Sequence, residues 1–368
     1  MLRILTVIGT RPEAIKLAPL VHELRRNSEQ FETVVCLSGQ HRELVVPLVE
    51  YFELRPDVDL ALMTHDQTAA GLTAVALAAF HELIGRIQPD WIVVQGDTAT
   101  TLAASMSAFL NRRPLLHVEA GLRTGSLDQP WPEEFNRRVT TLAASRHAAP
   151  TQHAADQLIS EGVDPSRVRV TGNTVIDALE WTREREASHG NRWLDRHPYA
   201  AAGQLVVVTA HRRENLGKGL HRIAAAIDRL AAQFPEVTFL WPVHPNPQVT
   251  QTVRRDLAGR ANVRLVEPLE YAEFVWLMDC ATLLISDSGG IQEEAPTLRK
   301  PLLVLREVTE RPEAIESGVV ELVGTATDRI VAAAGAWLSG QRSLPTNIIN
   351  PFGVGDAAAQ IVRWLAEP

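Results

Sequence analysis

The sequence predicts an α/β protein built from two Rossmann-like, doubly wound domains that face one another. Its 368 residues are too many for one ordinary core and suit two domains of roughly 150–200 residues. Short apolar runs typical of strands alternate with helical patterns along the chain, which implies parallel sheets with helices on both faces. Polar and glycine-containing segments follow several of these runs, where parallel sheets bind their ligands.

The first half of the chain carries the first set of expected strands. A helix is expected between the first two, because apolar residues from Ala14 to Leu24 recur at helical spacing. Further helices are expected at residues 98–111 and 152–161. The strands are expected at residues 4–8, 33–37, 91–95, 115–118, 147–149 and 168–170.

The second half repeats this scheme after a polar stretch at residues 182–197. Ile223, Ile227 and Leu230 mark the helix that follows the first strand of this half. The strands are expected at residues 205–209, 238–241, 263–266, 283–285 and 302–305.

Composition narrows the class of protein. Apolar residues make up 45% and charged residues 22% of the chain, as in soluble globular proteins, and the apolar runs are shorter than the roughly 20 residues of a membrane span. Residues 1–8 are typical of a strand rather than a signal peptide, so we expect a cytoplasmic protein without a membrane partner. The net charge of −8 argues against a nucleic-acid partner.

The two cysteines, Cys36 and Cys280, lie in or beside apolar stretches, where we expect them to be buried. Two cysteines cannot form a Cys-rich zinc site, and the His-Glu-x-x-His motif does not occur. No metal site is therefore predicted.

The segment at residues 286–296 is the most informative motif. It follows an apolar strand and opens a short helix, and Gly289 and Gly290 would let a phosphate approach bare backbone N–H groups. Glu293 or Glu294, one turn later, could accept hydrogen bonds from a ribose. The alternative is a plain strand-to-helix turn in which the glycines allow tight packing.

A second motif joins the first strand to the first helix. Arg11 and Lys16 lie near the positive end of this helix, where the dipole disfavours cations unless an anion binds there. The dinucleotide motif Gly-x-Gly-x-x-Gly does not occur at this turn, which argues against a nicotinamide cofactor. We therefore predict an anionic ligand and no cofactor.

Acidic residues follow two apolar strands and open a further helix. Asp97 could cap a helix, whereas Glu119 has no capping role, so a site role is favoured for it. Glu133 and Glu134 lie at a helix start, where either could serve the site or simply complement the helix dipole.

Basic residues follow two strands of the second half. His211 lies between a strand end and two arginines, which favours a phosphate contact over a place in the core. His244 could bind a ligand or shape a turn, and Arg311 lies on a loop after a strand. We expect all these segments to converge on a cleft between the two domains.

Together these segments resemble the non-hydrolysing UDP-N-acetylglucosamine 2-epimerases, whose two-domain fold is called GT-B. The match extends over nearly the whole chain. The matching motifs are GTRPEAIK at 9–16, QGDT at 95–98, HVEAGLRTG at 117–125, PEEFNRR at 132–138, VTGNTVIDAL at 170–179, AHRREN at 210–215, SDSGGIQEEAP at 286–296 and TERPEA at 309–314.

The resemblance implies interconversion of UDP-GlcNAc and UDP-ManNAc for cell-surface polysaccharide synthesis, by a homodimer. It implies an N-terminal domain at residues 1–172, to which a final helix at about 353–368 returns, and a UDP-binding domain at 173–352. Asp97, Glu119, Glu133 and His211 would be catalytic. The UDP moiety would be held by Arg11, Lys16, His211, Phe274, Ser288, Gly289, Gly290, Glu294 and Arg311.

Members of this family often bind a second UDP-GlcNAc as an activator. The resemblance places that pocket at Gln40, His41, Gln67, Arg213 and His244. Glu43 and Asp66 stand where regulated members have Gln and Arg, and both acids would repel a diphosphate.

The chemistry follows from the substrate. The hydrogen on carbon 2 is not adjacent to a carbonyl, so inversion requires either transient oxidation by a nicotinamide or loss of UDP. The many cations and the missing dinucleotide motif favour elimination through 2-acetamidoglucal. A hydrolysing epimerase, a GT-B glycosyltransferase and an inactive nucleotide-sugar sensor remain as alternatives.

Overall fold

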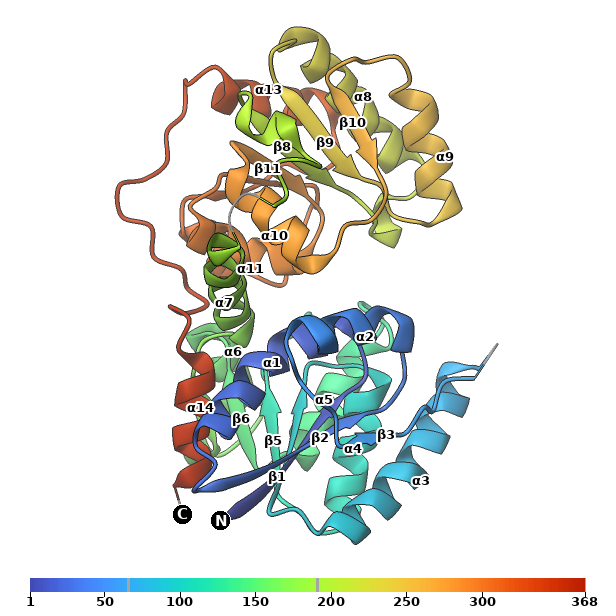
Figure 1. The fold of residues 1–368 in the computed structure, drawn as a ribbon, viewed down its shortest axis with the longest axis vertical. Coiled ribbons are helices and arrows are strands. Elements are labelled where there is room, and N and C mark those ends of the chain that lie inside the picture. Colours follow the sequence, from blue (N-terminus) through green and yellow to red (C-terminus); the bar gives the residue numbers. More distant parts are fainter. Residues whose placement is uncertain (65–66, 190–191, 368) are drawn as a thin grey trace. The chain divides into compact units, whose positions relative to one another are not determined.

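The computed structural model describes residues 1–64, 67–189 and 192–367. The chain divides into two compact units (Figure 1). Unit 1 comprises Met1–Ala178 and Phe352–Pro368, and unit 2 comprises Leu179–Pro351.

Unit 1 contains a parallel sheet of seven strands within the described residues, in the order β3-β2-β1-β4-β5-β6-β7. The buried strands are almost entirely apolar, as expected of a sheet covered on both faces. The strands are β1 Leu2–Ile8, β2 Phe31–Leu37, β3 Val58–Asp59, β4 Trp91–Gln95, β5 Leu115–Val118, β6 Arg146–Ala149 and β7 Val168–Val170.

Helices of unit 1 cover the sheet and connect successive strands (Figure 1). The main core under α3 and α4 includes Leu5, Phe80 and Ile92. The helices are α1 Arg11–Arg26, α2 Arg42–Tyr51, α3 Ala69–Ile87, α4 Ala99–Leu110, α5 Glu133–Ala143, α6 Gln152–Ser160, η1 Pro165–Arg167, α7 Thr174–Ser188, which continues into unit 2, and α14 Ala357–Ala366.

The helix α3 corrects the expectation that every apolar run is too short to span a membrane. Its 19 residues have a mean hydropathy of 1.3, so by length and composition alone it could cross a membrane. However, Leu72, Phe80 and Leu83 of this helix are buried in the core of unit 1. A core helix passes the same test of length and hydropathy, and packing accounts for the apolar residues on one side of α3.

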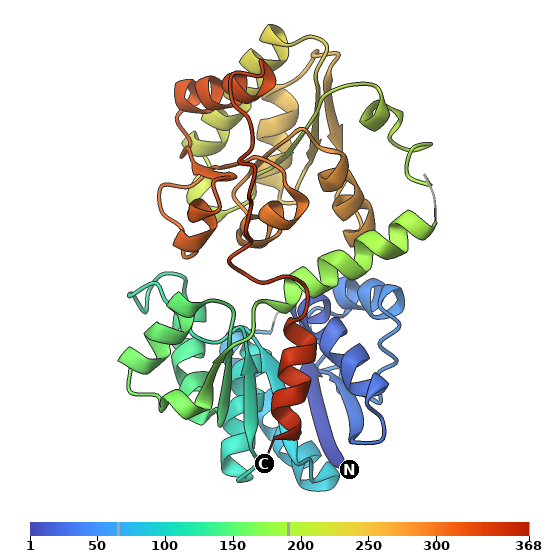
Figure 2. The same ribbon diagram turned by 90° about the vertical axis from the view of Figure 1, so that its left-hand side faces the viewer.

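The last helix, α14, packs against α1 in unit 1 (Figure 2). The Arg146 guanidinium lies 4.8 Å from the Trp91 ring and 5.4 Å from the Trp364 ring. The Arg169 guanidinium also lies over the Trp364 ring, at 4.8 Å, and Arg169 forms an ion pair with Glu367. These cation–π contacts hold the end of the chain on β4, β6 and β7.

Unit 2 contains a second parallel sheet, in the order β10-β9-β8-β11-β12-β13. Its core includes Trp241, Phe239 and Ile285. The strands are β8 Leu205–Thr209, β9 Thr238–Pro242, β10 Val263–Val266, β11 Leu283–Ser286, β12 Leu302–Val304 and β13 Val320–Leu322. The helices are η2 Pro198–Ala201, η3 Arg213–Asn215, α8 Lys218–Gln233, α9 Pro247–Asp256, α10 Tyr271–Cys280, α11 Gly289–Leu298, α12 Pro312–Glu316 and α13 Thr327–Leu338.

Each sheet reverses its strand order at one point. In unit 1 the reversal lies between β1 and β4, and in unit 2 it lies between β8 and β11. Ligands of open parallel sheets bind beyond the carboxyl ends of the strands at this point. The loops that matter for function are therefore those that follow these four strands.

The predicted α/β fold with two parallel sheets is confirmed, with differences in detail. The short strands β3 and β13 were not expected, because each has only two or three residues. The polar stretch at 182–197 begins inside α7, where Arg183 pairs with Glu180 one turn away. The predicted helices α1, α4, α6 and α8 are present.

Candidate active site

Glu119 lies at the centre of the polar groups of unit 1. It directly follows β5 and has φ of +62°, a conformation that non-glycine residues seldom adopt and that is concentrated at functional sites. Its buried carboxylate accepts hydrogen bonds from Lys16 and Gln95, and from Asn173 Nδ2 at 2.9 Å. A carboxylate held by three donors is fixed in orientation.

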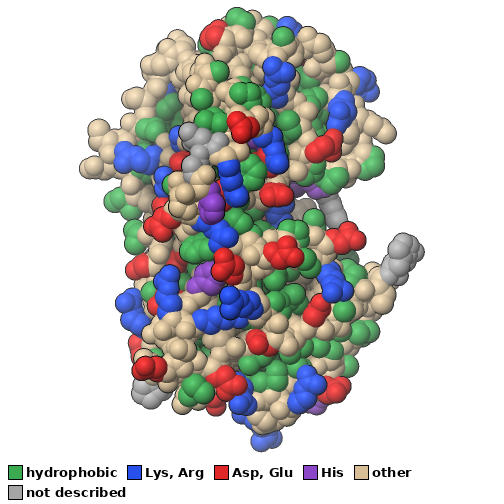
Figure 3. Space-filling model, in the orientation of Figure 1, with side chains coloured by type: hydrophobic (Ala, Val, Ile, Leu, Met, Phe, Trp, Pro, Cys, Tyr) green, Lys and Arg blue, Asp and Glu red, His purple; other side chains and the backbone are tan. Residues whose placement is uncertain are grey.

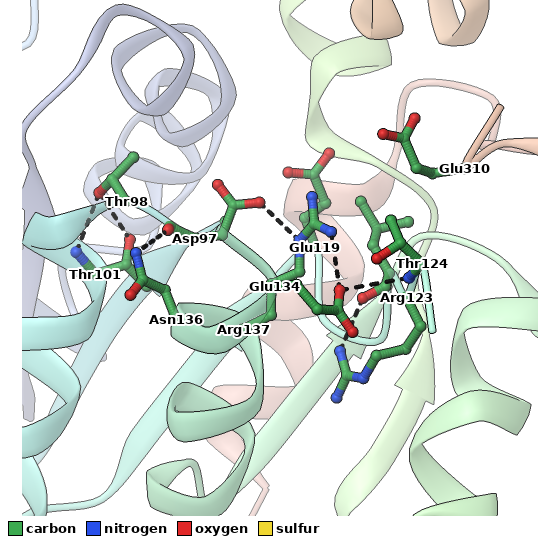
Figure 4. Close-up of polar contacts among 12 residues, drawn as sticks. Asp97, Thr98, Thr101, Glu119, Arg123, Thr124, Glu134, Asn136, Arg137 and Glu310 are labelled. Carbon is green, nitrogen blue, oxygen red and sulfur yellow. Dashed lines mark hydrogen bonds and ion pairs between the residues drawn. The ribbon is translucent and has the colours of Figure 1, made fainter. Parts of the chain in front are cut away.

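Asp97 lies after β4, next to Glu119. Thr98 is the N-cap of α4, since its side chain accepts the Thr101 N–H, so the structure gives Asp97 no capping role. Arg137 Nε donates to Asp97 Oδ2 at 2.7 Å (Figure 4). Burial raises the pKa of the Asp97 carboxyl, Arg137 lowers it, and the charges of Glu119 and Glu133 raise it, with a net upward direction.

The two acids at the start of α5 have different surroundings. Glu134 is fully buried and binds Arg137 at 3.2 Å (Figure 4). It also binds Arg138 at 3.2 Å. Glu133 Oε2 is also buried but has no hydrogen-bond partner within the described residues. Glu134 therefore has a structural role, and Glu133 is the acid still available to a ligand.

The loop after β1 places two cations at the start of α1. Lys16 is buried and forms an ion pair with Glu119, and Arg11 is half-buried at the first residue of the helix. Glu13 accepts hydrogen bonds from the Gly9 and Thr10 N–H groups at 2.6 and 2.7 Å. The buried Glu13 therefore fixes the loop that carries Arg11.

In unit 2 the corresponding loops are held together by Asp287, which follows β11. Its Oδ2 accepts the His211 and Arg212 N–H groups at 2.9 Å each and Asn215 Nδ2 at 3.0 Å. Its Oδ1 lies 3.3 Å from His211 Nδ1. Asp287 thus fixes the loop after β8 that carries His211.

His244 lies against His211. The two rings stack with centroids 5.4 Å apart and an angle of 8° between their planes. Because His244 Nδ1 accepts the Asn246 N–H at 3.2 Å, a neutral His244 carries its proton on Nε2. Both histidines therefore belong to one cluster at the carboxyl end of the sheet of unit 2.

Arg311 lies directly over the start of α11. A Cβ added to Gly289 would come within 2.8 Å of Arg311 Nη1, so the guanidinium packs directly against the bare backbone of this glycine. Arg311 Nε donates to Glu293 Oε1 at 2.5 Å, and Ser288 is the N-cap residue of α11. The helix N-terminus and an arginine thus meet at the Gly289-Gly290 pair, as an anion site requires.

The remaining UDP-binding candidates also lie in unit 2. Glu293 is paired with Arg311, and Glu294, the candidate for a ribose contact, is also buried on α11. Phe274 is half-buried on α10. Its neighbour Glu273 is fixed by His197 Nε2 at 2.7 Å.

The activator candidates are only partly described. The side-chain oxygen of Gln40 accepts the Thr100 hydroxyl at 2.8 Å, at the start of α4. Glu43 is exposed on α2, and Gln67 accepts the Thr64 N–H at 3.1 Å. Asp66 lies outside the described residues, as does the side chain of Arg213.

A sequence profile of the family described as UDP-N-acetylglucosamine 2-epimerase matches residues 22–366. The chain belongs to this family. The UDP-N-acetylglucosamine 2-epimerase of Yersinia pestis is 45% identical to it over 99% of this chain and 98% of that protein. The motif resemblance to the epimerase family is thus confirmed.

Solved epimerase structures are similar over almost the whole chain. The UDP-GlcNAc 2-epimerase of Neisseria meningitidis bound to UDP-GlcNAc is 41% identical with a TM-score of 0.92, and 99% of both chains are covered. The Methanocaldococcus jannaschii enzyme in complex with UDP-GlcNAc and UDP is 31% identical with a TM-score of 0.84, again over 99% of both chains. The two-domain α/β fold is that of these epimerases.

Several residues of the candidate site were not predicted from the sequence. Gln95 and Asn173 both bind Glu119, and Asp287 organises the loop of His211. Arg306 connects two loops of unit 2, through Glu214 and Glu310 at 2.8 Å each. Each of them lies inside or beside a quoted motif, but their roles depend on contacts between segments far apart in sequence.

Proposed function

We propose that this chain is a non-hydrolysing UDP-GlcNAc 2-epimerase that interconverts UDP-GlcNAc and UDP-ManNAc. The observation that carries the proposal is the group of acids in unit 1, in which the charges of both Glu119 and Glu133 raise the pKa of Asp97. Inversion at carbon 2 needs a base on one face of the sugar and an acid on the other. Neighbouring carboxyls whose pKa values differ supply both.

In the proposed reaction UDP leaves first. The bond between carbon 1 and the phosphate oxygen breaks, and the electron pair departs with UDP. A carboxylate takes the proton from carbon 2, which leaves 2-acetamidoglucal with a double bond between carbons 1 and 2. Protonation of carbon 2 from the opposite face and return of UDP to carbon 1 give the epimer.

We assign the binding of the UDP leaving group to residues at the carboxyl end of the sheet in unit 2. Gly289 and Gly290 would offer backbone N–H groups, and Arg311 and His211 would neutralise the growing charge. Arg11 and Lys16 of unit 1 would contribute further positive charge. We assign Glu294 to the ribose and Phe274 to the uracil, and we infer that Asp97, Glu119 and Glu133 act on the sugar.

We further propose a homodimer formed through the helices α3, α4 and α5. These helices pack side by side in unit 1 and expose large apolar side chains, which Figure 3 shows gathered over α3. Contiguous exposed apolar patches of this kind mark protein interfaces. The exposed residues are Val75, Met106, Phe109, Leu110, Phe135 and Leu142.

The test of the proposed function is to incubate the purified protein with UDP-GlcNAc and identify the products. We expect an equilibrium mixture of UDP-GlcNAc and UDP-ManNAc without free sugar. Release of free ManNAc and UDP would indicate the hydrolysing alternative. Turnover only with a second sugar would indicate a glycosyltransferase, and binding without turnover would indicate a sensor.

A further inference from the structure

Asn173 lies where both connections between the units enter unit 1. It directly precedes α7, along which the chain leaves unit 1 after Ala178. Its backbone N–H donates to the carbonyl of Phe352 at 2.7 Å, and Phe352 is the residue at which the chain returns to unit 1. Asn173 is only 2% exposed.

The side chain of Asn173 has two partners. Its Nδ2 donates to Glu119 Oε1 at 2.9 Å, and its Oδ1 accepts the Val175 N–H at 3.1 Å in the first turn of α7. One amide therefore binds both the carboxylate and the start of the helix. Only a side chain with a donor and an acceptor can make both contacts.

The backbone around Asn173 has little room to shift. Gly172 has φ of +83°, and a Cβ there would lie 2.9 Å from the Phe352 carbonyl oxygen. The same Cβ would lie 3.3 Å from Gly353 Cα. The Nδ2 group of Asn173 is thus presented to Glu119 from a closely packed junction.

We propose that Asn173 is a positioning residue for Glu119, an inference that rests on the proposed function. Lys16, the charged partner of Glu119, is also a candidate ligand of the diphosphate, and a bound substrate would compete for its ammonium group. The neutral donors Asn173 and Gln95 would then hold the carboxylate without adding charge. Orientation matters because a displacement of about 1 Å can cost about 100-fold in rate.

The test uses Asn173→Asp and Asn173→Ser. Both variants keep an oxygen that can accept the Val175 N–H, and both remove the Nδ2 amide group that donates to Glu119. We expect kcat for epimerisation to fall by about 10- to 100-fold, with KM for UDP-GlcNAc and the Kd for UDP within about twofold of the wild-type values.

The pKa of Glu119 should rise in both variants, because its carboxylate loses a hydrogen-bond donor. It should rise further in Asn173→Asp, which also adds a negative charge beside Glu119. The titration would be followed by carboxyl 13C NMR, with Glu119→Gln used to assign the signal. The titratable groups that interact with Glu119 are Lys16 of α1, Asp97 after β4 and His117 of β5. This measurement does not depend on turnover.

The matched control is Asp164→Ala, which removes a cap from η1, at the other end of β7 from Asn173. It should lower Tm without changing kcat or the titration of Glu119. If Asn173→Ser lowers only Tm and leaves both readouts unchanged, Asn173 is a helix cap and the inference is wrong. Wild-type protein that does not turn over UDP-GlcNAc would contradict the proposed function, while the NMR titration would still decide the role of Asn173.

Discussion

At the scale of single residues, the structure separates acids that the sequence left equivalent. Glu134 is neutralised by two arginines, whereas Glu133 keeps a buried oxygen without a hydrogen-bond partner in the described part of the chain. Thr98 caps α4, and Asp97 instead meets Arg137. The partner of Asp97 lies 40 positions away, so a single sequence cannot identify it, whereas the arginines that pair with Glu134 lie only three and four positions further along α5.

Substitutions of the acids test their assigned roles. Asp97→Asn or Glu119→Gln should lower kcat at least about 100-fold, because loss of an acid–base group typically costs that much. UDP binding, measured by calorimetry, should remain within a few-fold of wild type. Asp156→Asn, on the exposed face of α6, is the control with full activity; unchanged turnover in Asp97→Asn or Glu119→Gln would remove that residue from the mechanism.

Two buried histidines beneath the site make stability depend on pH. His117 and His147 are neighbours on β5 and β6, and burial lowers their pKa values to about 4 and about 3. The unfolded chain binds these protons near pH 6.5, so stability present above that pH is lost as the pH falls towards 4. Each histidine contributes about 1.4 kcal/mol per pH unit in this window.

His147→Leu isolates one of these contributions. Neither ring nitrogen of His147 has a hydrogen-bond partner in the residues described, so the apolar replacement should preserve stability at pH 7.5. Denaturant unfolding between pH 6 and pH 4.5 should show a smaller loss in the variant than in the wild type. Equal losses would mean that His147 does not titrate on unfolding.

At the scale of elements, several loops that carry the candidate site follow β1, β4, β8 and β11, at the two reversals of strand order, and Glu119 follows the adjacent strand β5. The sequence predicted these strands well, because each is a buried apolar run with a polar segment after it. It did not predict β3 and β13, which have only two or three residues each and pair with β2 and β12 at the sheet edges. The junction at Gly172 was likewise not predictable, since its partner Phe352 lies far along the chain.

Gly172→Ala tests that junction. The new Cβ would meet the Phe352 carbonyl at 2.9 Å in addition to the strain of a positive φ, and it should move Asn173. We expect a lower Tm together with a lower kcat. Gly162 has φ of +91° with open space around it. Gly162→Ala should therefore lower the free energy of unfolding by about 1 kcal/mol and leave kcat unchanged. Equal kcat values in the two variants would contradict the proposed link between the Gly172 junction and the position of Asn173.

At the scale of the whole molecule, the last helix, α14, returns to unit 1. Asp177 caps this helix by accepting the Ala358 N–H at 2.9 Å. The family motifs predicted the two-domain α/β fold and the identity of most candidate site residues. They could not give the surface that α3, α4 and α5 expose, because a helix with apolar residues on several sides does not reveal which side stays uncovered.

Phe109→Glu tests the proposed dimer surface. Phe109 is 66% exposed on α4, so a charge there should leave the monomer folded and disfavour the association of two apolar faces. Sedimentation should change from dimer to monomer, with unchanged circular dichroism. Ile159→Glu on α6, another exposed apolar position, should leave the mass unchanged; a Phe109→Glu protein that remains dimeric would place the interface elsewhere.

The central claim is that UDP leaves while the proton on carbon 2 is exchanged, and incubation of the protein with UDP-GlcNAc in heavy water tests it most directly. We expect UDP-ManNAc that carries deuterium at carbon 2, detected by loss of that proton signal in NMR. UDP-ManNAc that retains the original hydrogen at carbon 2 would contradict elimination and re-addition.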